Sequence, residues 1–433
     1  MAGLLLGLEF SIKEPRAYMQ AYGTVGVCLF LLEYVVPFMG KRCFCLCLAP
    51  VLIALFAAQL LSSPPVMKEE NDGILKVIQL TSEGDHQTLR GKLLVEAQDG
   101  SLLIEDNKQL LHVIPGETVA HREIFDDEYL LTPKELGQEI VAELPAGFTF
   151  LTTRHYVICY DTSLGYARWS AALLERLFSG FHAFWSQAGL DVSQPKQPLI
   201  VIIYSNRNDY ERAAKKEVGN ASHSIVGYYN QLTNRITTYD ITGSDSTDKT
   251  PSQSSHSVGT EILRNPRASS LIATLVHEAT HQLAFNAGLH LRLSPTPVWL
   301  SEGIATYFET PDLTNSRGWR SIGTINTTRL ELVVKQFTPG LISRFIADDN
   351  PFHDPDEALV AYAHAWVFVS FLATTKKDAF CSYVAHFDTK EPLGKDSAAD
   401  RMAEFKTAFG TTPDVLEPEL IQYIHSLARR KRP

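Results

Sequence analysis

The pentapeptide HEATH at residues 277–281 restricts the possible folds of this chain more than any other feature. It stands in an apolar run, 270–286, whose period predicts a helix. On a helix, residues four apart share one face, so the imidazoles of His277 and His281 can reach one cation. Glu278 then lies beside that cation rather than on it. The run therefore predicts a metal-binding helix.

The flanks of this run set the expected helix ends and its packing. Ser269 or Ser270 is expected to cap the start, and Asn286 and Gly288 suit the end. The side opposite the ligands should face the core. The apolar residues expected there are Ile272, Leu275, Val276, Ala279 and Leu283.

A second helix is needed, because HExxH arises by chance in roughly one chain of this size per hundred. Pro297 opens the periodic run VWLSEGIATYFE at 298–309, which Pro311 stops. Glu302 on this helix completes a His₂Glu set for Zn²⁺ and leaves the fourth position to water, as catalytic zinc requires. The sequence thus predicts a zinc site built from two helices.

The first 65 residues are expected to lie outside the folded domains. Residues 43–61 form an apolar stretch without charge, preceded by Lys41-Arg42 and followed by polar residues. This order is typical of a signal peptide or a membrane anchor with its C-terminal side outside. Both alternatives stay open, and a start at Met39 would make residues 1–38 an upstream extension. The protein is therefore expected outside the cytoplasm: secreted, periplasmic, or attached to a membrane by an uncleaved leader.

The net charge bears on the binding partners, and the cysteine content bears on possible disulfides. A net charge of −10 argues against nucleic acid as a partner, and the basic run 429–432 is interpreted as a solvated helix end. Cys159 and Cys381 are the two cysteines beyond the leader, and the sequence does not show whether they pair.

The rest of the chain divides into two domains of an α+β protein. Residues 66–125 are predicted to form a small β meander at 74–114, with turns at Asp99-Gly100 and Asn107-Lys108. This domain is either a binding module or a brace. Residues 134–430 are predicted to start with a mixed sheet and helices and to end in a helical half. The elements expected in this domain are helices at 135–143, 164–188 and from 206–208, strands at 148–160, 198–204 and within 223–241, a Ser-rich loop at 242–262, and helices at 270–286, 297–309, 328–336, 357–373, 376–387, 398–408 and 415–430.

HEATH together with TPVWLSEGIATYFE resembles the gluzincins, the zinc peptidases related to thermolysin and to aminopeptidases. More narrowly, residues 134–430 are similar to a bacterial family of exported proteins known only as a domain of unknown function in that peptidase clan. The passages that carry this likeness are 149–163, 198–213, 226–230, 277–283 and 297–309. The resemblance implies a gluzincin fold with both motif helices beside a cleft.

The resemblance also implies roles for individual residues. Glu278 would act as general base on a zinc-activated water, and Tyr362 or His364 would stabilise the oxyanion, with packing as the alternative for both. The strand around 226–229 would pair with the substrate backbone. Where thermolysin-like enzymes have a second-shell Asp, this chain has Thr306, which is expected to contact a ligand imidazole.

Three functions remain open at this stage. The first is hydrolysis of a peptide or protein substrate. The second is hydrolysis of a non-peptide amide by the same chemistry. The third is a cell-surface binding or scaffolding protein that keeps the fold with little turnover; Glu278 argues against it, because a chain that only binds zinc needs no base there.

Overall fold

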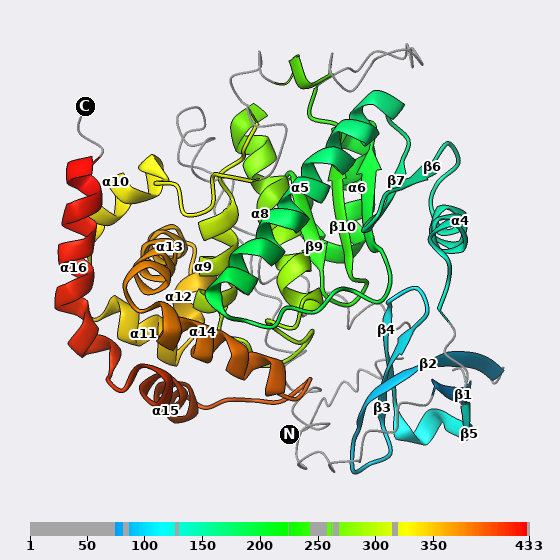
Figure 1. Cartoon of the computed structure of the whole chain (residues 1–433). Helices are drawn as coiled ribbons and strands as arrows, with labels where there is room; N and C mark the ends of the chain where they lie inside the picture. Colours follow the sequence, from blue (N-terminus) through cyan, green and yellow to red (C-terminus); the bar gives the residue numbers. More distant parts are fainter. Residues whose placement is uncertain are drawn as a thin grey trace, which may run out of the picture.

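The protein consists of an N-terminal β-sheet, a second β-sheet and a set of helices (Figure 1). The computed structural model describes residues 74–80, 86–125, 130–223, 225–242, 258–260, 262, 268–313 and 319–430. After the second sheet, every described element of regular structure is a helix, so the predicted α+β class, with a mixed sheet first and a helical half second, is confirmed. The predicted leader and most of the Ser-rich loop at 242–262 lie outside the described residues.

The N-terminal sheet is antiparallel and has the order β4-β3-β2-β1-β5. Its strands are β1 (Ile74–Leu80), β2 (His86–Glu96), β3 (Leu102–Asp106), β4 (Leu111–Ile114) and β5 (Val119–Phe125), with the 3₁₀ turn η1 (Gly116–Thr118) before β5. The predicted turn at Asp99-Gly100 is present, since Gly100 has a φ of 81° and Asp99 accepts a hydrogen bond from Ser101 N–H. Strand β5 lies beyond residue 114, where the predicted meander ends, and was not predicted.

The second sheet is mixed, with the order β6-β7-β8-β10-β9. Its strands are β6 (Thr149–Thr152), β7 (Tyr156–Tyr160), β8 (Leu199–Tyr204), β9 (Gly227–Asn230) and β10 (Arg235–Tyr239). Strands β7, β8 and β10 are parallel, while β6 and β9 are antiparallel edges. All six residues of β8 are apolar or aromatic and buried, as expected for a parallel strand covered by helices.

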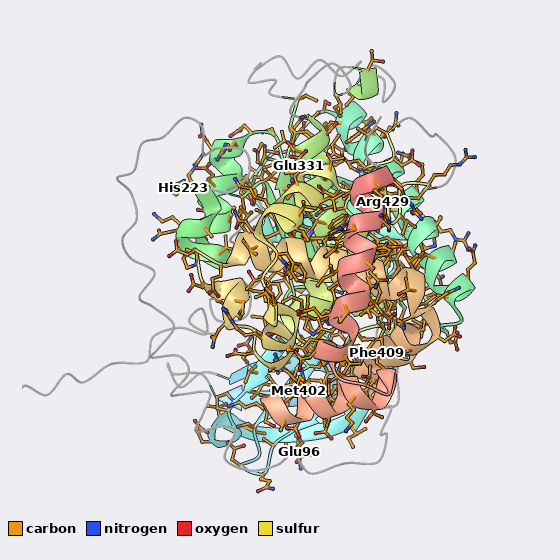
Figure 2. All side chains as sticks on the ribbon, turned by 90° about the vertical axis from the view of Figure 1, so that its left-hand side faces the viewer. Glu96, His223, Glu331, Met402, Phe409 and Arg429 are labelled. Atoms are coloured by element: carbon orange, nitrogen blue, oxygen red, sulfur yellow. The ribbon has the colours of Figure 1, made fainter. Side chains whose placement is uncertain are left out.

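Helix α8 (Ala268–Asn286), which carries HEATH, lies between two groups of helices in the described part of the chain. The first three are α4 (Pro133–Glu143), α5 (Leu164–Ala188) and α6 (Arg207–Val218), with η2 (Gly219–His223) after α6. The later ones are α9 (Val298–Phe308), α10 (Thr327–Gln336), α11 (Leu341–Ala347), α12 (Asn350–His353), α13 (Ala358–Thr375), α14 (Lys377–His386), η3 (Phe387–Thr389), α15 (Ala398–Phe409) and α16 (Pro413–Arg430). Helix α16 runs along the outside, with Arg429 near its end (Figure 2).

Helix α13 forms the centre of the helical half. It is long and apolar enough to span a membrane, but most of it is buried inside the protein, which is the property of a core helix. It packs directly against α9 at Gly303. A Cβ there would lie 2.5 Å from Val369 and 3.0 Å from the carbonyl oxygen of Ala365, so only glycine permits this close crossing. The crossing fixes the position of Glu302, the neighbouring residue.

Some local expectations need correction. Ser269 and Ser270 lie inside α8, which begins at Ala268, so neither caps it as predicted. The expected end is correct, since α8 ends at Asn286 and Gly288 has a φ of 79°. The sequence pattern does not predict α11 and α12, whose lengths are only 7 and 4 residues. Cys159 and Cys381 are both free and buried.

Candidate metal centre

Helix α8 carries the HEATH residues into the middle of the molecule. Every residue from Thr274 to Ala284 is buried, so the expected division into one core side and one open ligand side is too simple. The reason is that α8 contacts β9 and β10 as well as α5 and α9. Its polar side chains must therefore find partners within the protein, since a buried unpaired polar group is costly.

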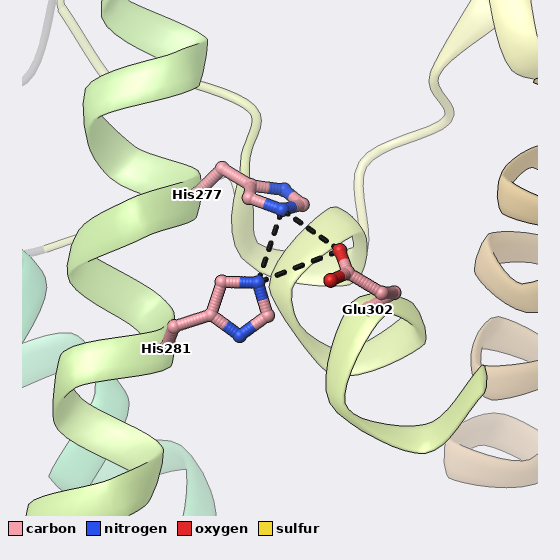
Figure 3. A group of neighbouring side chains, drawn as sticks. All are labelled: His277, His281 and Glu302. Atoms are coloured by element: carbon pink, nitrogen blue, oxygen red, sulfur yellow. Dashed lines mark hydrogen bonds and ion pairs between the residues drawn. The ribbon is translucent and has the colours of Figure 1, made fainter. Parts of the chain in front are cut away.

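His277, His281 and Glu302 point toward one another from α8 and α9 (Figure 3). The Nε2 atoms of the two histidines lie 3.2 Å apart. Glu302 Oε2 lies 3.1 Å from Nε2 of His277 and 3.4 Å from Nε2 of His281. All three residues are predicted as ligands from the sequence, and the structure brings them together.

These separations fit the edges of a coordination tetrahedron. Two donor atoms bound at the usual Zn–N and Zn–O distances, with tetrahedral angles, lie about 3.3–3.4 Å apart. The three observed separations, 3.1, 3.2 and 3.4 Å, are close to that value. Two imidazole nitrogens and one carboxylate oxygen are also a donor set of catalytic zinc sites. The described residues therefore fit a divalent metal ion.

His277 and Glu302 shift each other's pKa. Burial lowers the pKa of His277, but its hydrogen bonds to Glu302 and Glu309 outweigh this and raise the pKa to about 10. Burial raises the pKa of Glu302, yet the adjacent His281 and His277 lower it to about 2. The carboxylate is thus held ionised among positive neighbours, and a cation can take the place of the imidazolium proton.

Glu309 contacts the candidate ligand His277 and is not among the residues predicted from the sequence. Its Oε2 lies 3.4 Å from Nδ1 of His277, and its carboxylate is held by Arg329, with Nε to Oε1 at 2.8 Å. Asn326 at the N-cap of α10 donates to the same carboxylate. A carboxylate at Nδ1 fixes the tautomer that leaves Nε2 free to bind a metal. A signal was present, because Glu309 stands seven residues after Glu302 and so shares its helix face.

Thr306, the residue expected in that supporting role, does something else. Its hydroxyl donates to the backbone carbonyls of Glu302 at 2.7 Å and Gly303 at 3.0 Å. A short hydroxyl on a helix reaches the preceding turn of its own backbone more easily than an imidazole on another helix. The expected contact with a ligand imidazole is therefore made by Glu309.

Glu278 lies beside the three candidate ligands and is also buried. The backbone N–H of Tyr229, on edge strand β9, donates to Glu278 Oε2 over 2.8 Å. Burial raises the pKa of this carboxyl above its ordinary value, against the lowering effect of His277 and His281. The carboxylate is thus held at a fixed position next to the three candidate ligands.

Tyr362 and His364 lie on α13, the helix that packs against α9. His364 is fully buried; its Nδ1 donates to the carbonyl of Val360 at 2.7 Å, and its ring lies against Phe337. The ring of Tyr362 packs against Phe352. The structure therefore places both in packing contacts within the helical half, and the oxyanion role stays a prediction.

One comparison with known proteins gives a match, in the segment that contains His277, His281 and Glu302. Residues 271–394 match the family described as "Protein of unknown function (DUF1570)". The match covers less than a third of the 433 residues, but it includes HEATH, the Glu302 helix and α13. The comparison with curated proteins found no match.

Proposed function

We propose that this protein is a zinc-dependent peptide hydrolase of the gluzincin type, exported from the cytoplasm and acting on a peptide or protein substrate. One observation carries the proposal. His277, His281 and Glu302 offer three donor atoms within 3.4 Å of one another, and Glu278 is held beside them by a backbone hydrogen bond. Three protein ligands, an open fourth position and an adjacent carboxylate are the parts that a hydrolytic zinc site needs.

Each residue has a separate task in this proposal. His277, His281 and Glu302 would hold the zinc, and Glu309 would keep the His277 ring in the correct tautomer. When bound, zinc supplies Lewis acidity, which makes water more acidic and a carbonyl group more electrophilic. Glu278 takes a proton from the attacking water and returns it to the leaving amine. Tyr229 N–H keeps the carboxylate oriented for both transfers.

The position of β9 favours a peptide over another amide. Strand β9 is the edge of its sheet, and its backbone at Tyr229 reaches Glu278 directly. An extended peptide recognises such an edge by main-chain hydrogen bonds. A non-peptide amide would gain nothing from the strand, although the chemistry at Glu278 would be identical.

The proposal is tested with the full-length chain, loaded with zinc and incubated with a mixed peptide library read by mass spectrometry. Replacing Glu278 by Gln should lower the cleavage rate by roughly 10²–10⁴-fold without loss of zinc, because a general base contributes about that factor. Glu331→Gln, on the exposed face of α10, is the matched control and should cleave as wild type does. A zinc-loaded wild type that leaves the library intact would favour the binding or scaffolding function.

A further inference from the structure

A buried cluster of amide side chains joins the N-terminal sheet to the metal helix. Gln109, in the β3–β4 turn, donates from Nε2 to the carbonyl of Pro198 at 2.9 Å. Its Oε1 accepts a hydrogen bond from Asn234 Nδ2 at 2.7 Å. Asn234 also exchanges two hydrogen bonds of 2.8 Å with Asn286, at the end of α8. The turn of one domain is thus bonded to the metal helix of the other through Asn234.

Further contacts dock this turn. Arg292 donates to the carbonyls of Gln109 and Gln231 and pairs with Glu105 of β3. The backbone N–H of Leu111 donates to the carbonyl of Leu232 at 2.8 Å. The leucines of both parts form one apolar cluster around these bonds. Its buried members are Leu103, Leu111, Leu232 and Leu293.

Tyr229 links the cluster to the Glu278 side chain. The hydroxyl of Tyr229 donates to Asn234 Oδ1 at 2.8 Å, while the backbone N–H of Tyr229 donates to Glu278. Its ring stacks on Phe285 of α8, with centroids 5.9 Å apart. The two ends of Tyr229 are therefore fixed by the interdomain cluster and by the proposed base. Asn234 is thus hydrogen-bonded to the residue whose backbone N–H holds the Glu278 carboxylate.

We infer that Gln109 is a positioning residue for Glu278, and that the N-terminal sheet braces the metal site through the Gln109–Asn234–Tyr229 chain. The inference rests on the proposed function for its catalytic consequence, but the hydrogen-bonded link stands independently of any metal. Gln109 is 6% exposed and its side-chain amide is bonded through both its oxygen and its nitrogen, so no solvent contact competes with this role. The brace is the N-terminal sheet, whose turn residue lies 169 positions before Glu278 in the chain.

Gln109→Asn is the most informative variant. Gln109 has a φ of 67°, a left-handed conformation that Asn tolerates better than Ala. Asn keeps the amide but is one methylene shorter, so it cannot span to Asn234. Lys108→Ala is the matched control. Lys108 is the residue before Gln109, and the change removes its surface ion pair with Glu143, which also links the two parts of the chain.

The first measurement is amide hydrogen exchange in the metal-free full-length chain. We expect Gln109→Asn to speed exchange in the fragment containing residues 227–230 by roughly tenfold, and Lys108→Ala by less than about twofold. Helix α16, which packs on the helical half away from this cluster, serves as an internal reference and should not change. Unchanged exchange at 227–230, or an equal rise in α16, would overturn the positioning role.

The second measurement separates this inference from the proposed function. With zinc bound, Gln109→Asn should lower kcat for a library peptide roughly tenfold at constant zinc content, and should cause no further loss in the Glu278→Gln background. If wild type cleaves nothing while the exchange result holds, the proposed function fails and the link stands. If wild type is active and Gln109→Asn lowers its kcat equally in both backgrounds, the link to Glu278 fails and the function stands.

Discussion

Helices α8 and α13 are both buried on every side over their middle turns, and both carry histidine, yet the two environments are opposite. In α8, carboxylates from a neighbouring helix face the imidazole of His277 and raise its pKa to about 10. In α13, burial lowers the pKa of His364, whose nearest partner is the carbonyl of Val360. Two histidines with equal burial therefore have pKa values shifted in opposite directions.

This difference shows what separates a candidate site from a core. Burying an ionised group is unfavourable unless opposite charges and hydrogen bonds surround it. The chain places Glu302, Glu309 and Arg329 around His277. Among the described residues, the contacts of the His364 ring are an aromatic neighbour and one backbone oxygen. The first arrangement suits a cation, and the second suits a neutral packing residue. The following experiments test that contrast, starting with the largest expected effect.

Replacing Glu302 by Ala should abolish stoichiometric zinc binding. The change removes one of three donor atoms and leaves two imidazoles without their carboxylate, so zinc affinity should fall by more than about a hundredfold. Competition with a chromophoric chelator measures it. Full zinc affinity in this variant would show that α8 does not hold the metal in the way proposed.

Replacing Glu309 by Gln should weaken zinc binding by roughly 10–100-fold, the usual effect of losing a carboxylate behind a ligand histidine. Thr306→Val is its control, because the Thr306 hydroxyl contacts only backbone carbonyls of its own helix. The same competition assay compares them. If the Thr306 variant loses more affinity than the Glu309 variant, the assignment of the supporting residue is reversed.

His290 provides a pH test of a buried neutral histidine close to the metal helix. Burial, with the charge of His281 adding to it, lowers the pKa of His290 to about 3. Its folded-state pKa is below the unfolded value of about 6.5, so the unfolded chain binds more protons and stability falls as the pH drops below that value. Between pH 7 and pH 5 this loss should be about 2 kcal/mol.

The check is urea unfolding of the metal-free chain at both pH values, for wild type and His290→Leu. The Leu variant should lose about 2 kcal/mol less than wild type over this interval. Equal losses in the two proteins would mean that the pKa of His290 is the same in the folded and the unfolded chain, which would contradict its lowering by burial.

The smallest effect is expected for His364→Phe. Losing the hydrogen bond to Val360 should cost about 1 kcal/mol of stability, with zinc content and cleavage rate within about twofold of wild type. His425→Phe, at an exposed position of α16, is the control. A hundredfold slower cleavage with zinc retained would instead identify His364 as an oxyanion donor. His364 would then be a site residue, as His277 is, and not a packing residue.

The elements of the site differ in how far the sequence predicts them. HEATH and Glu302 are visible because a helix converts a four-residue spacing into one face, and Pro297 marks where the second helix starts. Glu309 lies on the predicted helix, but its partner Arg329 comes from α10 and has no local pattern. Nothing near Gln109 or Asn234 in the sequence indicates that they meet, because that contact depends on how two domains dock.

The most direct measurement of the central claim is the metal content of the purified full-length chain, together with X-ray absorption at the zinc edge. We expect one zinc per chain, with two imidazole nitrogens and one carboxylate oxygen among its ligands, and a loss of that signal in Glu302→Ala. A chain that takes up no stoichiometric zinc, or binds it without imidazole ligands, would contradict the assignment of His277, His281 and Glu302 as a metal centre.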